Sequence, residues 1–201
     1  MGSKNVNWLK ISGVCGIITP IFMSTFILLA IAHSPQFSWT ENALSDLGVQ
    51  EGAAAILFNS GLIIGGFLTL VFVSGLFVLQ KTVLGRIGVF IFVLAALALM
   101  AIGVFPENAG RIHYYVSVAF FLLFPVSMFV IGATFLLTAK AKMGFFTFLA
   151  AIVASLVWAI QWTIGFGSNV AIPETLSALS AFAWFIVLGF KMLRETSHMR
   201  N

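Results

Sequence analysis

Six long apolar segments, separated by short polar stretches, constrain the fold of this chain more than any other feature. They cover about residues 9–32, 52–79, 86–105, 112–138, 143–166 and 173–193. Each segment can cross a bilayer as a helix, since a crossing takes about 20 apolar residues. Charged residues make up only 8% of the chain, far below the share in soluble domains. The sequence therefore predicts an all-α integral membrane protein, a bundle of six transmembrane helices forming a single domain over residues 1–201.

The charged residues alternate between the two sides that six crossings would create. Nine of the ten Lys and Arg residues fall on the side of the two termini, and only Arg111 falls on the other. Five of the six acids share the side of Arg111, namely Glu41, Asp46, Glu51, Glu107 and Glu174. Because basic loops stay in the cytoplasm, we expect cytoplasmic N- and C-termini and a multi-pass protein of the plasma membrane.

The distribution of charge and the cysteine and histidine content limit the partners and cofactors that can be expected. The net charge of +4 comes from cations spread in small groups over the cytoplasmic turns, which suits lipid headgroups better than a polynucleotide. We therefore expect membrane lipids as partners, and neither nucleic acid nor a soluble partner. The single cysteine, Cys15, lies in the first apolar segment and provides no disulfide framework. We expect no cofactor, because paired histidines that would hold haem within the bilayer are missing.

The stretch 40–48, between the first two apolar segments, holds the densest group of polar side chains. Polar groups at a membrane boundary are costly unless they have partners, so Ser45 and Asp46 indicate a site. A structural alternative is that Asn42, Ser45 and Asp46 cap short turns, with Gly48 at a positive-φ position.

Further polar residues lie at similar depth in other segments. Asn59 is about 10 Å inside the second segment, Gln161 is roughly 8 Å inside the fifth, and His113 is near the start of the fourth. Such amides also serve simply as hydrogen-bond partners between helices, and Glu107 could pair with Arg111 across a turn. We predict one polar site at the outer face, with ligand-binding candidates Asp46, Asn59, Glu107, His113 and Gln161.

The motifs Leu44-Ser45-Asp46-Leu47-Gly48 and Phe105-Pro106-Glu107, followed by His113, carry a family resemblance. With them the chain resembles the membrane family called domain of unknown function 998 over nearly its whole length. The Ser-Asp-x-Gly element is also similar to that of the wider Frag1, DRAM and Sfk1 group, although the Pro-Tyr that usually precedes it there is absent. The resemblance to that group implies a role in lipid remodelling or membrane lipid organisation.

Two functional hypotheses follow. The first is a lipid-binding or lipid-handling protein that admits a headgroup to the outer polar pocket. The alternative is an intramembrane metal-dependent hydrolase of a lipid-like substrate, in which Asp46, Glu107 and His113 bind a metal that activates water and Ser45 assists. Its catalytic candidates are therefore Ser45, Asp46, Glu107 and His113. Whether the protein is an enzyme is left open by the residues.

Two packing features also lead to expectations. Gly61 and Gly65 form a GxxxG pair, for which packing within the chain is favoured over a dimer interface. Trp184 falls near the bilayer midplane, so its indole N–H needs a partner inside the protein.

Overall fold

The computed structural model describes residues 3–198 and contains six long helices, each apolar and long enough to cross a membrane. No strand occurs in this part of the chain. The helices are α1 (Ser3–Ala32), α2 (Ala53–Leu79), α3 (Val83–Val104), α4 (Arg111–Leu137), α5 (Ala141–Thr163) and α6 (Ala171–His198). The predicted six-helix membrane bundle is thus confirmed. Arg200, one of the predicted cytoplasmic cations, lies outside the described residues.

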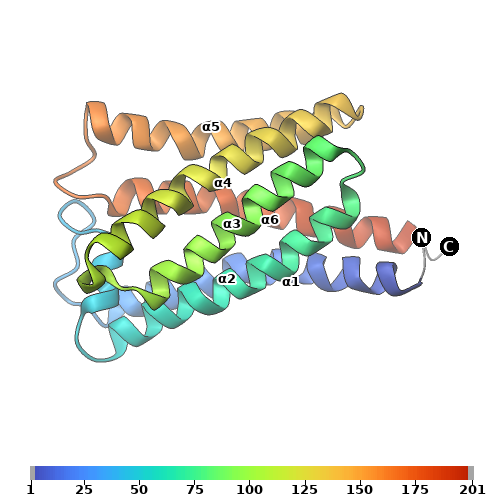
Figure 1. The fold of residues 1–201 in the computed structure, drawn as a ribbon. Helices are drawn as coiled ribbons and strands as arrows, with labels where there is room; N and C mark the ends of the chain where they lie inside the picture. Colours follow the sequence, from blue (N-terminus) through green and yellow to red (C-terminus); the bar gives the residue numbers. More distant parts are fainter. Residues whose placement is uncertain (1–2, 199–201) are drawn as a thin grey trace.

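The two ends of the bundle differ in their connections and charge (Figure 1). The start of α1 and the end of α6 lie at one end, together with the α2–α3 and α4–α5 turns. The opposite end carries the 3₁₀ helices η1 (Leu44–Val49) and η2 (Glu107–Ala109) and the α5–α6 connection. We call this second end the acidic end, because five of the six acids lie there. Its predicted exterior location remains a prediction.

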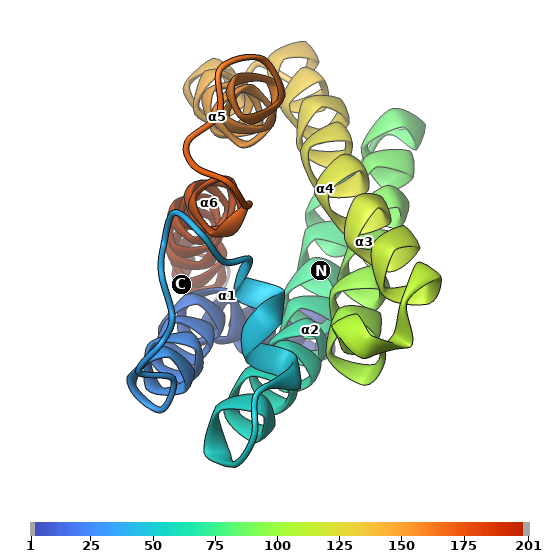
Figure 2. The ribbon, with the colours of Figure 1, turned by 90° about the vertical axis from the view of Figure 1, so that its left-hand side faces the viewer.

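The helices form a ring of neighbours that follows the chain order. Each helix packs against the next one, and α6 returns to pack against α1. Viewed from the acidic end, η1 lies within this ring (Figure 2), where it contacts α2, η2 and α6. The first interhelical connection therefore covers part of the bundle interior.

A cluster of aromatic side chains fills the middle of the bundle. Trp184 is fully buried, and its ring lies 5.5 Å from the ring of Phe92 and 5.9 Å from that of Phe72. Its indole N–H donates to Thr147 Oγ1 at 2.9 Å, which satisfies the only polar group of the side chain. The predicted need of Trp184 for a partner inside the protein is confirmed.

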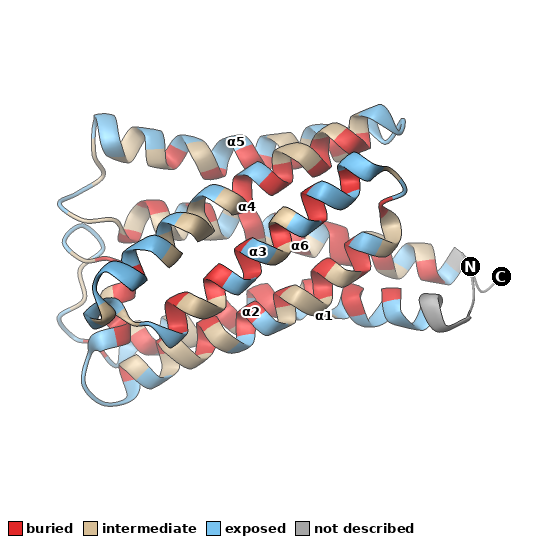
Figure 3. Cartoon of the chain, in the orientation of Figure 1, coloured by how far each residue is buried: buried red, intermediate tan, exposed pale blue. Residues whose placement is uncertain are grey.

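The outer faces of the helices are apolar, as a bilayer requires. Buried positions recur along one face of each helix and exposed positions along the other (Figure 3). Phe90 on α3 is 62% exposed, and Ile56 on α2 is 71% exposed. In a bilayer these side chains would contact acyl chains.

The GxxxG glycines of α2 are used within the chain. A Cβ at Gly61 would lie 2.8 Å from Phe26 Cβ, and one at Gly65 would lie 2.5 Å from the Met23 side chain. Both neighbours belong to α1, so the small residues allow α1 and α2 to approach closely. This confirms the interpretation of the pair as packing within the chain.

Candidate functional site

The site begins with Asp46 on η1, which organises its own loop. Asp46 Oδ2 accepts hydrogen bonds from the Asn42 side-chain amide at 2.8 Å and from the Ala43 N–H at 3.1 Å. Asn42 Oδ1 in turn accepts the Ser38 N–H at 2.8 Å. The predicted turn-forming role of Asn42 and Asp46 is therefore correct, because both side chains satisfy backbone N–H groups that no regular helix would pair.

Glu174, in the first turn of α6, ties that helix to η1. Its Oε2 accepts the backbone N–H of Leu44 at 2.6 Å, across 130 positions of sequence. The carboxylate also lies at the N-terminal end of α6, where the helix dipole favours negative charge. Glu174 therefore links the last interhelical connection to the first.

Glu107 lies on η2, in the connection between α3 and α4. Its carboxyl group is hydrogen-bonded to that of Asp46, and such a bond requires a proton on one of the two groups because ionised carboxylates only accept. Burial, then the hydrogen bond and negative charge of Asp46, raises the pKa of Glu107 from 4.5 to about 7. Glu174 interacts electrostatically with both. We call Asp46, Glu107 and Glu174 the acidic cluster.

Within residues 3–198, burial, hydrogen bonds and neighbouring carboxyl groups dominate the surroundings of Glu107 and Glu174, and no cationic side chain is among these main influences. Arg111 is exposed, and it is not among the main influences on Glu107, the partner considered for it from the sequence. Three carboxyl groups therefore meet without a positive side chain to balance them, so protons or an external cation must supply the compensating charge.

His113 lies near the cluster and holds the end of α3 to the start of α4. Its Nδ1 is 2.8 Å from the Phe105 carbonyl oxygen, and since that oxygen only accepts, Nδ1 carries the proton. Nε2 is then an acceptor for the Ser117 hydroxyl, 3.3 Å away. The Ser117 hydroxyl is thus paired with a side chain, whereas the hydroxyls of Thr69 and Ser155 donate to the backbone of their own helices.

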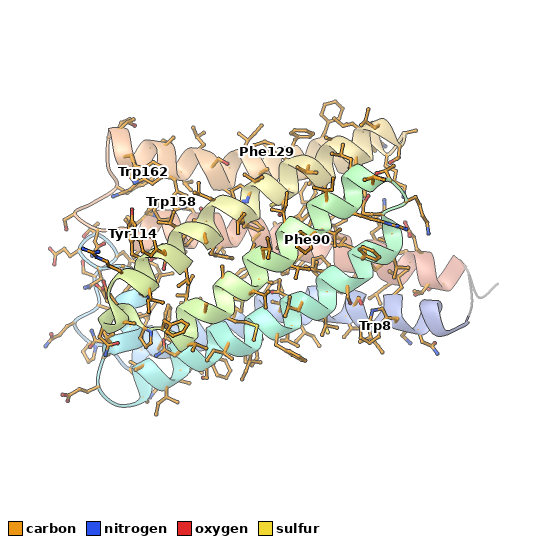
Figure 4. The ribbon with its side chains drawn as sticks, viewed as in Figure 1. Trp8, Phe90, Tyr114, Phe129, Trp158 and Trp162 are labelled. Atoms are coloured by element: carbon orange, nitrogen blue, oxygen red, sulfur yellow. The ribbon has the colours of Figure 1, made fainter. Side chains whose placement is uncertain are left out.

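A cavity of about 700 Å³ lies between α4 and α5 and reaches the acidic cluster. Most of its polar lining lies at the acidic end, where Ser45, Glu107, His113, Ser117, Asn169 and Glu174 contribute, and Ser155 on α5 is a further polar lining residue. The rest of the lining is largely apolar and includes Val118, Phe121, Leu122, Pro125, Val126, Phe129, Trp158, Ala159 and Trp162. Figure 4 shows Tyr114, Trp158 and Trp162 toward the acidic end and Phe129 farther along the bundle. The cavity is therefore polar at one end and apolar along its length.

A second, smaller cavity of about 80 Å³ adjoins the first inside the helix ring. The two share Ser45, Ser117, Phe121 and Glu174 in their linings. The remaining lining of the smaller cavity is apolar apart from Thr69, so the polar groups of the site lie where the two cavities meet.

The two predicted amides lie outside the linings of both cavities. Asn59 Nδ2 donates to the Gly48 carbonyl at 2.8 Å, and Gln161 Nε2 donates to the Asn169 carbonyl at 3.2 Å. Gln161 Oε1 also accepts the Phe166 N–H at 3.0 Å. Both side chains therefore hold loops of the acidic end in this structure, and their role in ligand binding stays a prediction.

The predicted positive φ at Gly48 is wrong, because the left-handed glycines are Gly52, Gly110 and Gly165. Gly48 is required for space instead. A Cβ there would lie 2.6 Å from Asn59 Oδ1, so a larger residue would separate η1 from α2.

A metal centre receives no geometric support. Among the described residues, no three His, Cys, Asp or Glu side chains gather in a way that could hold a metal ion. Asp46 and Glu107 lie together, but Nδ1 of His113 is occupied by the Phe105 carbonyl.

Three site residues were not among the candidates chosen from the sequence. Glu174 could have been found from its position at the start of an even-numbered helix, which matches the position of Glu107. Ser117 follows His113 by four residues, the spacing that places side chains on one helix face. Trp158 gives no such signal, because an aromatic residue in an apolar segment is ordinary.

Comparisons with known proteins give a family match without adding a function. A family model described as "Protein of unknown function (DUF998)" matches residues 17–191, a range that includes the acidic cluster, His113 and the cavity lining. No curated protein and no solved structure matches the chain.

Proposed function

The chain belongs to the DUF998 family of proteins of unknown function, and we propose that it binds a membrane lipid in the cavity between α4 and α5. The headgroup would lie at the acidic end, at the outer face of the cell membrane. One acyl chain would follow the apolar wall toward the middle of the bundle. The protein would thus hold or hand on individual lipid molecules.

The observation that carries this proposal is the division of the cavity into a polar end and an apolar length. A volume of about 700 Å³ falls within the range of small-molecule sites, which is roughly 300–1,000 Å³. A wholly polar ligand would leave the apolar wall uncovered, and a plain hydrocarbon would leave the carboxyl groups without partners. An amphiphile satisfies both parts.

The position of the cavity supports entry from the bilayer. Leu122 and Val126 on α4 and Trp162 on α5 line it and are also exposed, by 55%, 45% and 74%. Side chains that combine both properties lie at an opening between the two helices. A lipid could therefore enter sideways and keep its acyl chain in an apolar environment throughout.

Hydrolysis of the bound lipid is the second candidate function, and the Ser117–His113 pair is the observation that favours it. The tautomer of His113 leaves Nε2 able to take the Ser117 proton, as a general base does for a nucleophilic hydroxyl. The Ser117 oxygen would attack the ester carbonyl of the lipid, and the lipid alcohol would leave with the proton taken up by His113. Water would then hydrolyse the ester on Ser117, which releases the fatty acid and restores the hydroxyl. This version needs no metal. Hydrolysis of a lipid ester by the unmodified protein, abolished in Ser117→Ala, would support this function. If the unmodified protein hydrolysed no lipid ester, lipid binding would remain as the proposed function.

Lipid retention by purified protein tests the main proposal. Ser155 lines the cavity on α5, whereas Ile152, one turn earlier, is exposed and does not line it. We expect Ser155→Phe to lower the lipid that co-purifies several-fold, as measured by native mass spectrometry, and Ile152→Phe to retain it. Equal retention by the two folded variants would contradict binding at this cavity.

A further inference from the structure

We propose that the headgroup which this cavity selects carries a positively charged ammonium group, either a protonated amine or a quaternary amine. The inference rests on the proposed lipid binding and adds the chemical class of the lipid. It is carried by the charge of the acidic cluster, the aromatic wall beside it and an indole N–H that lacks a partner.

The first observation is the uncompensated charge at the polar end of the cavity. Glu107 and Glu174 line the cavity, and Asp46 is hydrogen-bonded to Glu107 behind them. No Lys or Arg side chain is among the lining residues. A cationic headgroup would supply the missing counter-charge, whereas an anionic headgroup would add a further negative charge in a partly desolvated place.

The second observation is the aromatic wall next to these carboxyl groups. Phe121 on α4 and Trp158 on α5 have ring centroids 4.7 Å apart, and Trp162 lies 5.8 Å from Trp158. All three line the cavity, as does Tyr114. Aromatic faces attract ammonium groups, most strongly where water is excluded. Carboxylates and rings together form the kind of surface that recognises an amine.

The third observation is independent of the carboxyl groups. Trp158 Nε1 is buried and has no hydrogen-bond partner, although its ring lines the cavity. A buried donor without an acceptor is costly, so a turn of the indole that brings this N–H to a ligand oxygen in the cavity would be favourable. The phosphate or ester oxygens of a phospholipid provide such an acceptor. One lipid with an amine and a phosphate would therefore satisfy both the carboxyl groups and the indole.

A competition between lipids with matched acyl chains tests the inference. The purified protein is incubated in detergent with equal amounts of phosphatidylethanolamine, phosphatidylcholine and phosphatidylglycerol, and native mass spectrometry counts each bound species. We expect the two lipids with an ammonium group to exceed phosphatidylglycerol about tenfold each, the ratio that about 1.4 kcal/mol produces. The double variant Glu107→Gln, Glu174→Gln should bring this ratio close to one. Glu51→Gln, an exposed acid outside the cavity lining, should preserve it.

A second probe uses only the unmodified protein, so it does not depend on how the variants fold. N-acetylated phosphatidylethanolamine keeps the phosphate and loses the cationic amine, and we expect it to compete no better than phosphatidylglycerol. Lipid bound without headgroup preference, or with a preference for phosphatidylglycerol, would overturn the amine inference and leave lipid binding standing. A protein that retains none of the lipids would overturn both.

Discussion

Replacing Glu107 by Gln should remove the share of the pH dependence of bundle stability that Glu107 contributes. In the folded protein, burial and the neighbouring Asp46 carboxyl raise the pKa of Glu107 from 4.5 to about 7. The folded state therefore binds more protons than the unfolded state between these two values. Stability must then fall as pH rises through this window, because proton release favours unfolding.

The size of the effect follows from the same values. In the folded protein Glu107 is about half protonated at pH 7 and about 99% protonated at pH 5, whereas in the unfolded chain it is about half protonated at pH 4.5. The folded state therefore binds roughly half a proton to one proton more than the unfolded state throughout the window. One proton fully linked to folding changes stability by about 1.4 kcal/mol per pH unit. The Glu107 carboxyl group is only partly buried and the residue as a whole is exposed, so solvent screening should reduce this slope to a few tenths of a kcal/mol per unit.

Thermal unfolding in detergent, followed by circular dichroism from pH 4.5 to 8, measures this slope. The Gln amide can donate to Asp46 as the protonated carboxyl does, so Glu107→Gln should match the unmodified protein at pH 4.5 and exceed it at pH 8. Glu51→Gln removes one exposed acid of the same end and should keep the original slope. If Glu107→Gln kept that slope as well, the shared proton would not lie on the Asp46–Glu107 pair.

Three further changes probe the bundle itself. Thr147→Val keeps the side-chain shape but leaves the Trp184 N–H without an acceptor. It should lower the free energy of unfolding in detergent titrations by about 1–2 kcal/mol, whereas Thr147→Ser should retain the hydrogen bond. Gly103→Ala would bring a methyl group to 2.6 Å from the backbone of α2, so it should lower the melting temperature, and an unchanged value would refute the close α2–α3 contact. Single cysteines at Asn108 and Lys140 should react with an impermeant thiol reagent from opposite sides of the membrane, and reaction from one side would end the six-crossing topology.

The helices could be predicted because a bilayer accepts few alternatives. Each apolar segment became a helix, since backbone groups in hydrocarbon must be paired within the segment. The ends were less predictable where side chains terminate a helix. The predicted fifth segment runs to about residue 166, whereas α5 ends at Thr163, because Gly165 adopts a φ of +84° and Gln161 accepts the Phe166 N–H.

The depth of the site along the helices could be predicted from the sequence, but the helix face that each side chain occupies could not. Counting residues from the helix ends gives the depth of Asn59 and Gln161 correctly near the acidic end, but depth does not say which helix face each occupies. Asn59 faces η1 and Gln161 faces the α5–α6 connection, and neither lines a cavity. Asp46 and Glu107 do lie together, since both belong to connections at the same end.

The acidic cluster has a structural role that does not account for its charge. Asp46 and Glu174 accept backbone N–H groups, and a neutral Asn, Gln or Ser side chain could accept such bonds as well. Three carboxyl groups in one place add mutual repulsion, which a loop clamp alone would not need. That repulsion is relieved in two ways, by a proton shared between Asp46 and Glu107 or by a cation that enters the cavity. The two compete for the same carboxyl groups, so an amine-bearing lipid should bind more tightly as pH rises through about 7 and should displace the shared proton. Calorimetry in buffers of different ionisation enthalpy would measure the number of protons released when the lipid binds. Binding at pH 6.5 without proton release would show that the headgroup does not bind at the acidic cluster.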